Sequence, residues 1–130
     1  MALLSAIYTS TFREIMMSLR FYSEFFNSTE DVLSDVIKQG TWPTTFVSGP
    51  SEGLYEHWHA DEVHAYIMEG EADFFDAKSG MRTQVKAGDK IVIPAKALHA
   101  EGAVKERVVY ILALPKPLPP EEFLAMHGSA

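Results

Sequence analysis

The chain has 130 residues, of which 47% are hydrophobic and 22% are charged, a composition typical of one globular domain and not of a fibrous or disordered chain. Its 18 acidic residues outnumber its 11 basic residues, and the net charge of −7 argues against binding to nucleic acid or to an anionic membrane surface. The absence of cysteine excludes disulfides, thiolate metal sites and thiol catalysis, so any transition metal must be held by histidines and carboxylates.

Residues 1–40 are predicted to form a helical segment. Apolar residues recur at helical spacing from Phe12 onward, which predicts a first helix over residues 12–26. A second helix is predicted to begin after an N-cap at Ser28 and to end near Lys38. Because the segment is rich in aromatic residues, we expect it to pack on the rest of the chain or on the partner in a homodimer.

Residues 41–114 have the pattern of a mainly β fold. Short runs rich in β-branched and aromatic residues alternate with glycine-containing turns, and strands are predicted at residues 44–48, 54–59, 63–68, 72–76, 83–85, 90–93, 98–101 and 107–114. The sequence around Gly70 predicts a tight hairpin turn, as do those around Gly80 and Gly88. Many short strands of this kind predict a sandwich or a barrel.

Residues 115–130 are predicted to form an extended tail. Four prolines within its first six residues prevent this segment from adding a central strand to the sheet. A short helix is predicted at residues 121–126.

The most informative motif is the sequence Tyr55-Glu56-His57-Trp58-His59. Side chains alternate along a strand, so Tyr55, His57 and His59 are predicted to lie on one face. Two imidazoles at this spacing can bind one metal ion. Ordinary surface histidines are the alternative interpretation of this motif taken alone.

Two glycine- and histidine-containing patterns resemble the motifs of the cupin superfamily. Gly88, Pro94 and His99 match the second motif, and the His57/His59 pair with Gly70 matches the first. The resemblance covers residues 44–114, with some local similarity to acireductone dioxygenases over residues 56–70. It implies a small double-stranded β-helix, or jelly-roll barrel, with one divalent transition metal (iron, manganese, nickel, copper or zinc) in its mouth, held by His57, His59 and His99. It also implies a homodimer.

The fourth ligand of the cupin motif is uncertain in this sequence, because the position of the usual glutamate is occupied by Val63. The neighbouring carboxylate is Glu62, and a one-residue shift along a strand reverses the face to which a side chain points. Either Val63 and Ala65 face inward beside three histidines, or Glu62 and His64 do. We expect Glu62 to lie near the metal as its fourth ligand.

Three side chains are candidates for catalysis besides the histidines. Glu101 follows His99 by two residues and should share its face, as a carboxylate close to the metal or as a base; a solvated glutamate at a strand end is the alternative. Tyr55 is predicted to contact the substrate or to pack as an aromatic residue, and Glu62 is the third candidate. His64 is expected to have a structural role. The family's glycine two residues after the proline is replaced by Lys96.

The resemblance favours a metal-dependent oxidoreductase of the dioxygenase kind that acts on a small polar molecule. A non-catalytic module that binds a metal or a small molecule is the first alternative, and a metal-independent epimerase or isomerase is the second. Because no signal-peptide pattern and no stretch long enough to span a membrane is present, we expect a cytoplasmic protein with a small-molecule partner.

Overall fold

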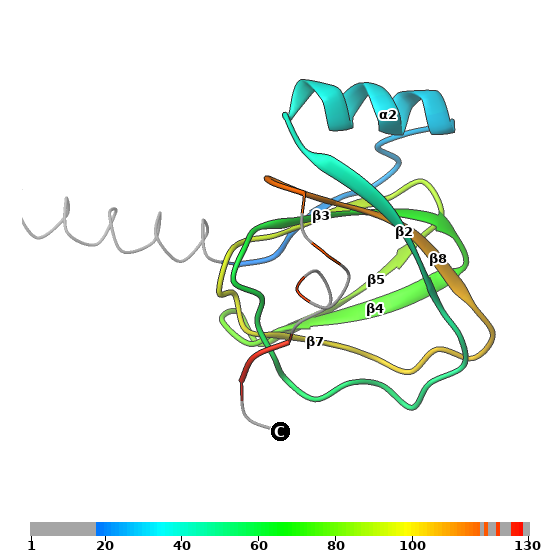
Figure 1. Cartoon of the computed structure of the whole chain (residues 1–130). Helices are drawn as coiled ribbons and strands as arrows, with labels where there is room; N and C mark the ends of the chain where they lie inside the picture. The colour runs from blue at the N-terminus through cyan, green and yellow to red at the C-terminus, as the bar shows by residue number, and fades with distance from the viewer. Residues whose placement is uncertain (1–17, 118, 120–121, 123–125, 129–130) are drawn as a thin grey trace, which may run out of the picture.

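The structure, a computed structural model, describes residues 18–117, 119, 122 and 126–128. Its elements in chain order are β1 (Arg20–Tyr22), α2 (Thr29–Lys38), β2 (Trp42–Ser48), β3 (Val63–Glu69), β4 (Glu71–Asp76), β5 (Met81–Lys86), β6 (Lys90–Ile93), β7 (His99–Glu101) and β8 (Val108–Leu114). The strands form a five-stranded sheet in the order β1-β6-β3-β8-β2 and a three-stranded sheet in the order β5-β4-β7, both antiparallel (Figure 1). The predicted mainly β jelly roll is confirmed.

The main core lies between the two sheets. Buried apolar side chains from both sheets contact one another there, and the cluster includes Ala65, Ile67, Phe74, Ile91 and Val108. Because side chains alternate along a strand, every second side chain of the five-stranded sheet points away from this core. Tyr66 and Ala113 are two of these, and they pack under α2. The fold therefore has an apolar barrel interior and a helix on the outside of one sheet.

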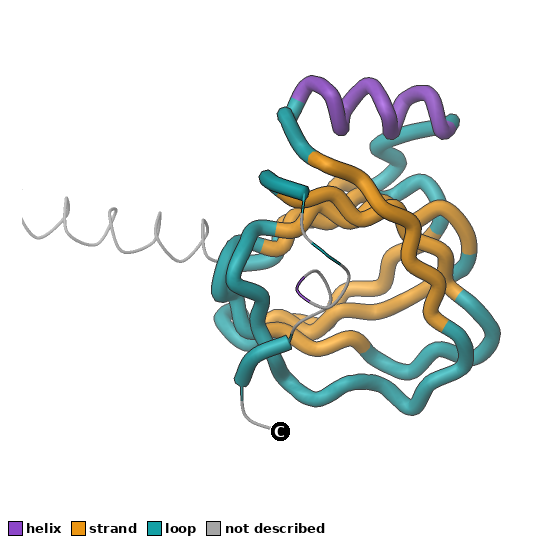
Figure 2. The backbone as a smooth tube through the Cα atoms, in the orientation of Figure 1, coloured by secondary structure: helices purple, strands orange, loops and turns teal. Residues whose placement is uncertain are grey.

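Most predicted strands agree with the structure. The strand predicted at residues 90–93 has the same bounds as β6. Six further predicted strands match β2, β3, β4, β5, β7 and β8 within two residues at each end. The prediction for residues 54–59 is wrong as a regular strand, because this segment pairs only through isolated bridges at His57 and Trp58. Figure 2 shows the long connection between β2 and β3 as loop over most of its length.

The turn at Gly70 joins two sheets and is not a hairpin. β3 and β4 belong to different sheets, so the chain crosses from one layer to the other at this point. Gly70 has a φ of +86°, and a Cβ atom there would lie 2.3 Å from the carbonyl oxygen of Arg107. The turn at Gly80 does join a hairpin, because Asp76 pairs with Met81 across it.

The first predicted helix is wrong where the structure describes it. Residues 18–26 contain β1, in which Phe21 pairs with Ile91 of β6, and residues 12–17 lie outside the described part. The side chains of Leu19 and Phe21, which are two residues apart, both pack against the barrel core. This alternation of buried side chains is that of a strand, and it differs from the helical spacing on which the prediction was based. The barrel therefore includes residues before the expected boundary at residue 41.

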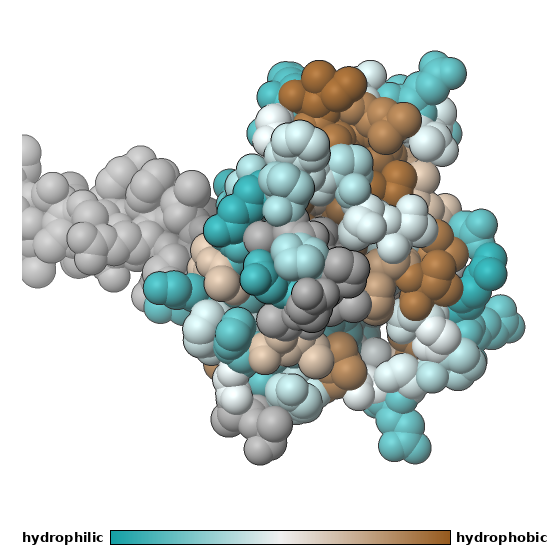
Figure 3. Space-filling view, viewed as in Figure 1, coloured by the Kyte–Doolittle hydropathy of each residue, from teal (hydrophilic) through white to brown (hydrophobic). Residues whose placement is uncertain are grey.

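The second predicted helix is confirmed as α2. The hydroxyl of Ser28 accepts a hydrogen bond from the backbone N–H of Asp31 at 3.2 Å, as an N-cap does. Val32 and Val36 are buried against the sheet, whereas Ile37 on the outer side is 79% exposed. Figure 3 shows apolar side chains over this helix.

The expected homodimer stays a prediction. Of the aromatic residues that suggested it, Phe26 is buried in the cluster under α2 and Phe21 packs against the core between the sheets, whereas Tyr22 and Phe25 are each 40% exposed. The predicted helix at residues 121–126 falls mostly outside the described residues. Among the described residues, no helix is long and apolar enough to cross a membrane.

Candidate metal centre

Two of the three predicted histidine ligands lie directly opposite each other across a pair of antiparallel segments. The backbone N–H of His57 donates to the carbonyl of His99, and that of His99 donates to the carbonyl of His57, both at 2.9 Å. Directly opposed residues project their side chains on the same side of the sheet. The two imidazole rings therefore meet inside the barrel, with centroids 4.5 Å apart and both side chains fully buried.

His59 completes the group from the same segment as His57. Its ring centroid lies 5.1 Å from that of His57 and 5.3 Å from that of His99. The carbonyl of His59 accepts a hydrogen bond of 2.8 Å from the backbone N–H of Lys96. Lys96 has a φ of +64°, in the left-handed region that favours glycine, which accounts physically for the glycine that cupins have there.

The histidine side chains are oriented as metal ligands are. The Nδ1–H of His57 donates to the carbonyl of Tyr55 at 2.7 Å, and the Nδ1–H of His99 donates to the carbonyl of Ala97 at 2.9 Å. Since a carbonyl only accepts, these bonds place a proton on Nδ1, so in the neutral ring the lone pair is on Nε2, which is the arrangement that a metal requires. Both Nε2 atoms are buried without a hydrogen-bond partner, and the ligand atoms of the three histidines lie within 4.8 Å of one another.

A carboxylate lies beside these nitrogens. Glu101 Oε2 is 3.3 Å from Nε2 of His57, and Glu101 Oε1 is 3.7 Å from Nε2 of His99. Burial by itself would raise the pKa of Glu101, but in the absence of metal a hydrogen bond from protonated His99 and the positive charges of protonated His99 and His57 outweigh it and hold the pKa below its usual value. The prediction that Glu101 shares the face of His99 is confirmed. These four side chains, His57, His59, His99 and Glu101, are the inner histidine cluster.

The inner histidine cluster opens into a pocket of about 340 Å³ inside the barrel. Its walls are mainly apolar side chains, namely Phe46, Leu54, Val63, Ala65, Ala72, Phe74, Ile93, Val104, Leu112 and Met126. Tyr110 also lines it, and burial, followed by the negative charge of Glu101, raises the pKa of its phenol. Among the described lining residues there is no lysine or arginine, so positive charge in the pocket can come only from protonated histidines or from a bound metal.

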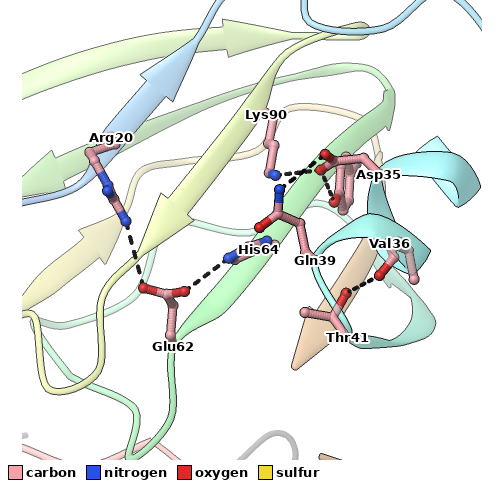
Figure 4. A network of polar contacts seen from close by, with 9 residues as sticks. Arg20, Asp35, Val36, Gln39, Thr41, Glu62, His64 and Lys90 are labelled. Atoms are coloured by element: carbon pink, nitrogen blue, oxygen red, sulfur yellow. Dashed lines mark hydrogen bonds and ion pairs between the residues drawn. The ribbon is translucent and has the colours of Figure 1, made fainter. Parts of the chain in front are cut away.

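Glu62 is not part of this group, and its prediction as the fourth ligand is corrected. Its carboxylate lies on the outer face of the sheet, 3.0 Å from Nε2 of His64 and 3.6 Å from the guanidinium of Arg20 (Figure 4). The alternative register is the observed one, because Val63 and Ala65 face the barrel interior. An apolar inner face is the easier one to bury.

A second polar group occupies the outer face beside α2. Asp35 of the helix accepts hydrogen bonds from the hydroxyl of Tyr66 at 2.6 Å and from the ammonium of Lys90 (Figure 4). Together with the ion pairs of Glu62 they form the outer polar cluster, which consists of Arg20, Asp35, Glu62, His64, Tyr66 and Lys90. His64 is buried there and paired with Glu62, which agrees with the structural role that was expected.

Tyr55 is placed differently from its prediction as a substrate contact. Its side chain is 45% exposed and does not line the pocket, and it is its carbonyl oxygen that orients His57. Trp58 points away from the cluster, as alternation predicts, and stacks on His127 with ring centroids 4.6 Å apart. The contact with His127 was missed, since no sequence signal relates the tail to this segment.

Gly102 is a further residue that sequence reasoning missed. A Cβ atom there would lie 1.6 Å from a carboxylate oxygen of Asp73, so any side chain at this position would displace the carboxylate of Asp73. The backbone N–H of Gly102 donates to the carbonyl of Asp73 at 3.0 Å. This hydrogen bond holds the chain beside β4 directly after Glu101, at the end of β7.

Solved structures of low sequence identity share this architecture. A DUF861 family protein from Thermotoga maritima is 14% identical with a TM-score of 0.56, and the match covers 74% of this chain and 98% of that chain. A cupin-2 domain containing protein from Shewanella frigidimarina is 22% identical with a TM-score of 0.50, covering 59% of this chain and 72% of that one. A chain from crystal structures of DMSP lyases is 21% identical with a TM-score of 0.51, covering 58% of this chain and 38% of that one.

These likenesses show the fold, which is the double-stranded β-helix of the cupins. No protein-family model matches the sequence, and no curated protein matches it either. One fold serves many chemistries, so the function has to be argued from the site itself.

Proposed function

From the premise that the chain is a small domain of cupin fold, we propose that it is a metal-dependent oxidoreductase of the dioxygenase kind. The observation that carries the proposal is the orientation of His57 and His99. Their Nδ1–H groups are bonded to carbonyls, while their Nε2 lone pairs are buried and directed at one point beside His59. A set of imidazoles with a carboxylate nearby suits iron, manganese, nickel, copper or zinc.

When bound, such a metal provides a Lewis acid and open positions for a substrate with two neighbouring oxygen atoms or for dioxygen. The chain's own residues supply the surroundings. The apolar walls around Phe74 and Leu112 exclude water and hold the body of the substrate. Tyr110 stays protonated because its pKa is raised, so its O–H can donate a hydrogen bond to a substrate oxygen.

The pocket sharpens the expected substrate. A small polar molecule was expected from the sequence, but the described walls offer no cation and few hydrogen-bonding groups. We therefore propose a substrate with an apolar body and one polar end that chelates the metal. A second charged group on that body would be buried without a counter-charge, which is costly.

A non-catalytic module that binds a metal or a small molecule is the second candidate, favoured by the breadth of chemistry that one fold supports. One of the solved neighbours is described as a lyase, which is a different reaction from oxygenation. A metal-independent isomerase, in which a histidine acts as base, is less well supported. Both buried Nε2 atoms face a carboxylate and each other, which suits a shared cation better than a free base.

Dioxygen uptake tests the proposed reaction. Untagged protein loaded with ferrous iron would be mixed with small catechols, enediols and α-hydroxyketones, beside chelator-stripped protein and the His59→Ala variant. We expect uptake with at least one class, lost in both controls. Turnover that survives chelation would favour the isomerase, and metal binding without turnover of any compound would favour the binding module.

A further inference from the structure

The carboxylate of Glu101 lies beside two of the three histidines that would hold the metal. It approaches Nε2 of His57 at 3.3 Å and Nε2 of His99 at 3.7 Å. Two ligand atoms that bind one ion at about 2.0–2.2 Å lie roughly 2.8–3.6 Å apart in tetrahedral or octahedral geometry. The spacing of Glu101 from His57 and His99 is therefore close to that of neighbouring ligands, although the group of ligand atoms within 4.8 Å of one another consists of the three histidines alone.

The balance of donors and acceptors indicates a cation between these atoms. In the neutral rings that a metal binds, the Nδ1–H bonds leave Nε2 of His57 and of His99 as acceptors, and an ionised carboxylate only accepts. Glu101 Oε2 is buried without a hydrogen-bond partner, as are both Nε2 atoms. Acceptors that face one another in a buried site repel unless a cation lies among them, and the third histidine, His59, favours a metal over a single proton.

The charge of the pocket points the same way. A divalent ion held by three neutral imidazoles alone would keep two positive charges in an apolar cavity, which is unfavourable without a compensating anion. Among the described residues that line the pocket, Glu101 is the only acidic side chain. Glu62 is engaged on the outer face with His64 and Arg20.

The backbone holds Glu101 in this place. Its carbonyl accepts a hydrogen bond of 3.0 Å from the N–H of Leu54, and it pairs with Phe74 of β4. Because Glu101 follows His99 by two residues on β7, both side chains point into the barrel.

We infer that Glu101 is the fourth protein ligand of the metal, taking the place of the carboxylate that cupins have where this chain has Val63. The inference rests on the proposed metal site and specifies its ligands as three histidines and one glutamate, with the glutamate supplied by β7 and not by β3.

Titration with Co²⁺ tests the inference through affinity and through the visible spectrum of the bound ion. The proteins are the untagged wild type, Glu101→Gln, Glu101→Ala and, as a matched control, Glu62→Gln. We expect both Glu101 variants to lose at least about 10-fold in Co²⁺ affinity, the lower end of the loss that even outer-shell changes cause, and to show an altered spectrum. Glu62→Gln should match the wild type in both readouts.

Three other results would contradict the metal site or the role of Glu101. A wild type that does not bind Co²⁺ overturns the proposed metal site and this inference with it. If the wild type binds but Glu101→Gln has the same affinity and spectrum, the metal site stands and the role of Glu101 is overturned. A weaker affinity with an unchanged spectrum makes Glu101 a positioning residue and overturns its role as ligand.

Should neither Glu101 variant fold, a crystal structure of the Co²⁺-loaded wild type decides. A carboxylate oxygen of Glu101 at about 2.0–2.2 Å from the metal supports the inference. A water molecule in that position, with Glu101 beyond bonding distance, overturns it.

Discussion

The protein buries histidines inside the barrel, at the edge of the three-stranded sheet, and on the outer face of the five-stranded sheet, and their surroundings differ. Inside the barrel, His57 and His99 have their Nδ1–H groups bonded to carbonyls and their Nε2 atoms directed at a carboxylate and at each other. On the outside, Nε2 of His64 lies 3.0 Å from Glu62, and that carboxylate is also paired with Arg20. The outer histidine has its Nε2 paired with a carboxylate and its Nδ1 buried without a hydrogen-bond partner, whereas the inner histidines have both Nδ1 atoms paired with carbonyls and both Nε2 atoms without a hydrogen-bond partner.

The comparison shows how a buried histidine indicates its role. Burial alone does not distinguish the two sites, since His57, His64 and His99 are all buried. The distinction lies in whether the neighbouring groups supply enough donors and positive charge. In the outer polar cluster every carboxylate faces a donor or a cation, with Lys90 and Tyr66 both donating to Asp35 and Arg20 beside Glu62. In the inner histidine cluster the carboxylate of Glu101 faces only histidines, and the metal that we propose would supply the positive charge.

The largest expected effect on stability comes from breaking the outer polar cluster. Asp35→Ala would leave the buried ammonium of Lys90 and the hydroxyl of Tyr66 without their shared acceptor. Removing one partner of a buried pair costs about 3–5 kcal/mol, so the free energy of unfolding should fall by that amount in a urea titration. Metal content should be unchanged in whatever fraction stays folded; a parallel loss of metal would show that the two clusters are not independent.

The same cluster predicts a loss of stability in acid. Burial by itself would raise the pKa of Asp35, but the hydrogen bonds from Lys90 and Tyr66 outweigh it and hold the pKa below the ordinary 3.8. A group with a lowered folded-state pKa stabilises the fold above its unfolded-state pKa, and that stabilisation is lost as the pH falls through the folded-state value. Melting temperatures between about pH 6 and about pH 2 should therefore fall more steeply in the wild type than in Asp35→Asn. Parallel curves would contradict the assignment.

In the inner histidine cluster the expected change has the opposite sign. Glu101→Gln replaces a buried acceptor by an amide whose N–H can donate to Nε2 of His57 or His99. The metal-free variant should therefore be more stable than the metal-free wild type by about 0.5–1.5 kcal/mol, the worth of one hydrogen bond. Chemical denaturation in the presence of a chelator measures the difference. A less stable variant would mean that the carboxylate is already satisfied without metal.

The smallest expected effect is that of Glu62→Gln. The side chain is 44% exposed and its contact with Arg20 is a surface ion pair, while the amide oxygen of glutamine can still accept from His64. We expect a change of less than about 1 kcal/mol in unfolding free energy and the same metal content per chain. A lower metal content in this variant than in the wild type would indicate that Glu62 is a ligand after all.

Local patterns predicted most elements because they depend on neighbouring residues. β6 and α2 follow from a short apolar run and from a capped amphipathic stretch, and both are found where they were expected. β1 was missed because the spacing of Leu19, Tyr22 and Phe26 fits a helix. The segment forms a strand because it pairs with β6, which lies about seventy residues further along the chain. The turn at Gly70 was recognised, but not that it connects two sheets.

The three histidines were predicted to converge because of the resemblance to cupin motifs, and the structure brings them together. The carboxylate could not be assigned in the same way, since a one-residue difference in register decides whether Glu62 or Val63 faces the barrel. Packing settles that register, because the interior next to Phe74 and Ile93 accepts an apolar side chain and not an ion pair. Glu101 was recognised by alternation with His99, but its distance to the histidines required the fold.

The central claim is that the inner histidine cluster holds a metal, and the most direct test is the metal content of the protein purified without a histidine tag. Elemental analysis of the wild type and of the His57→Ala and His99→Ala variants should find about one transition-metal ion per chain in the first and almost none in the others. A folded wild type that carries no metal and takes up none on titration would contradict the account.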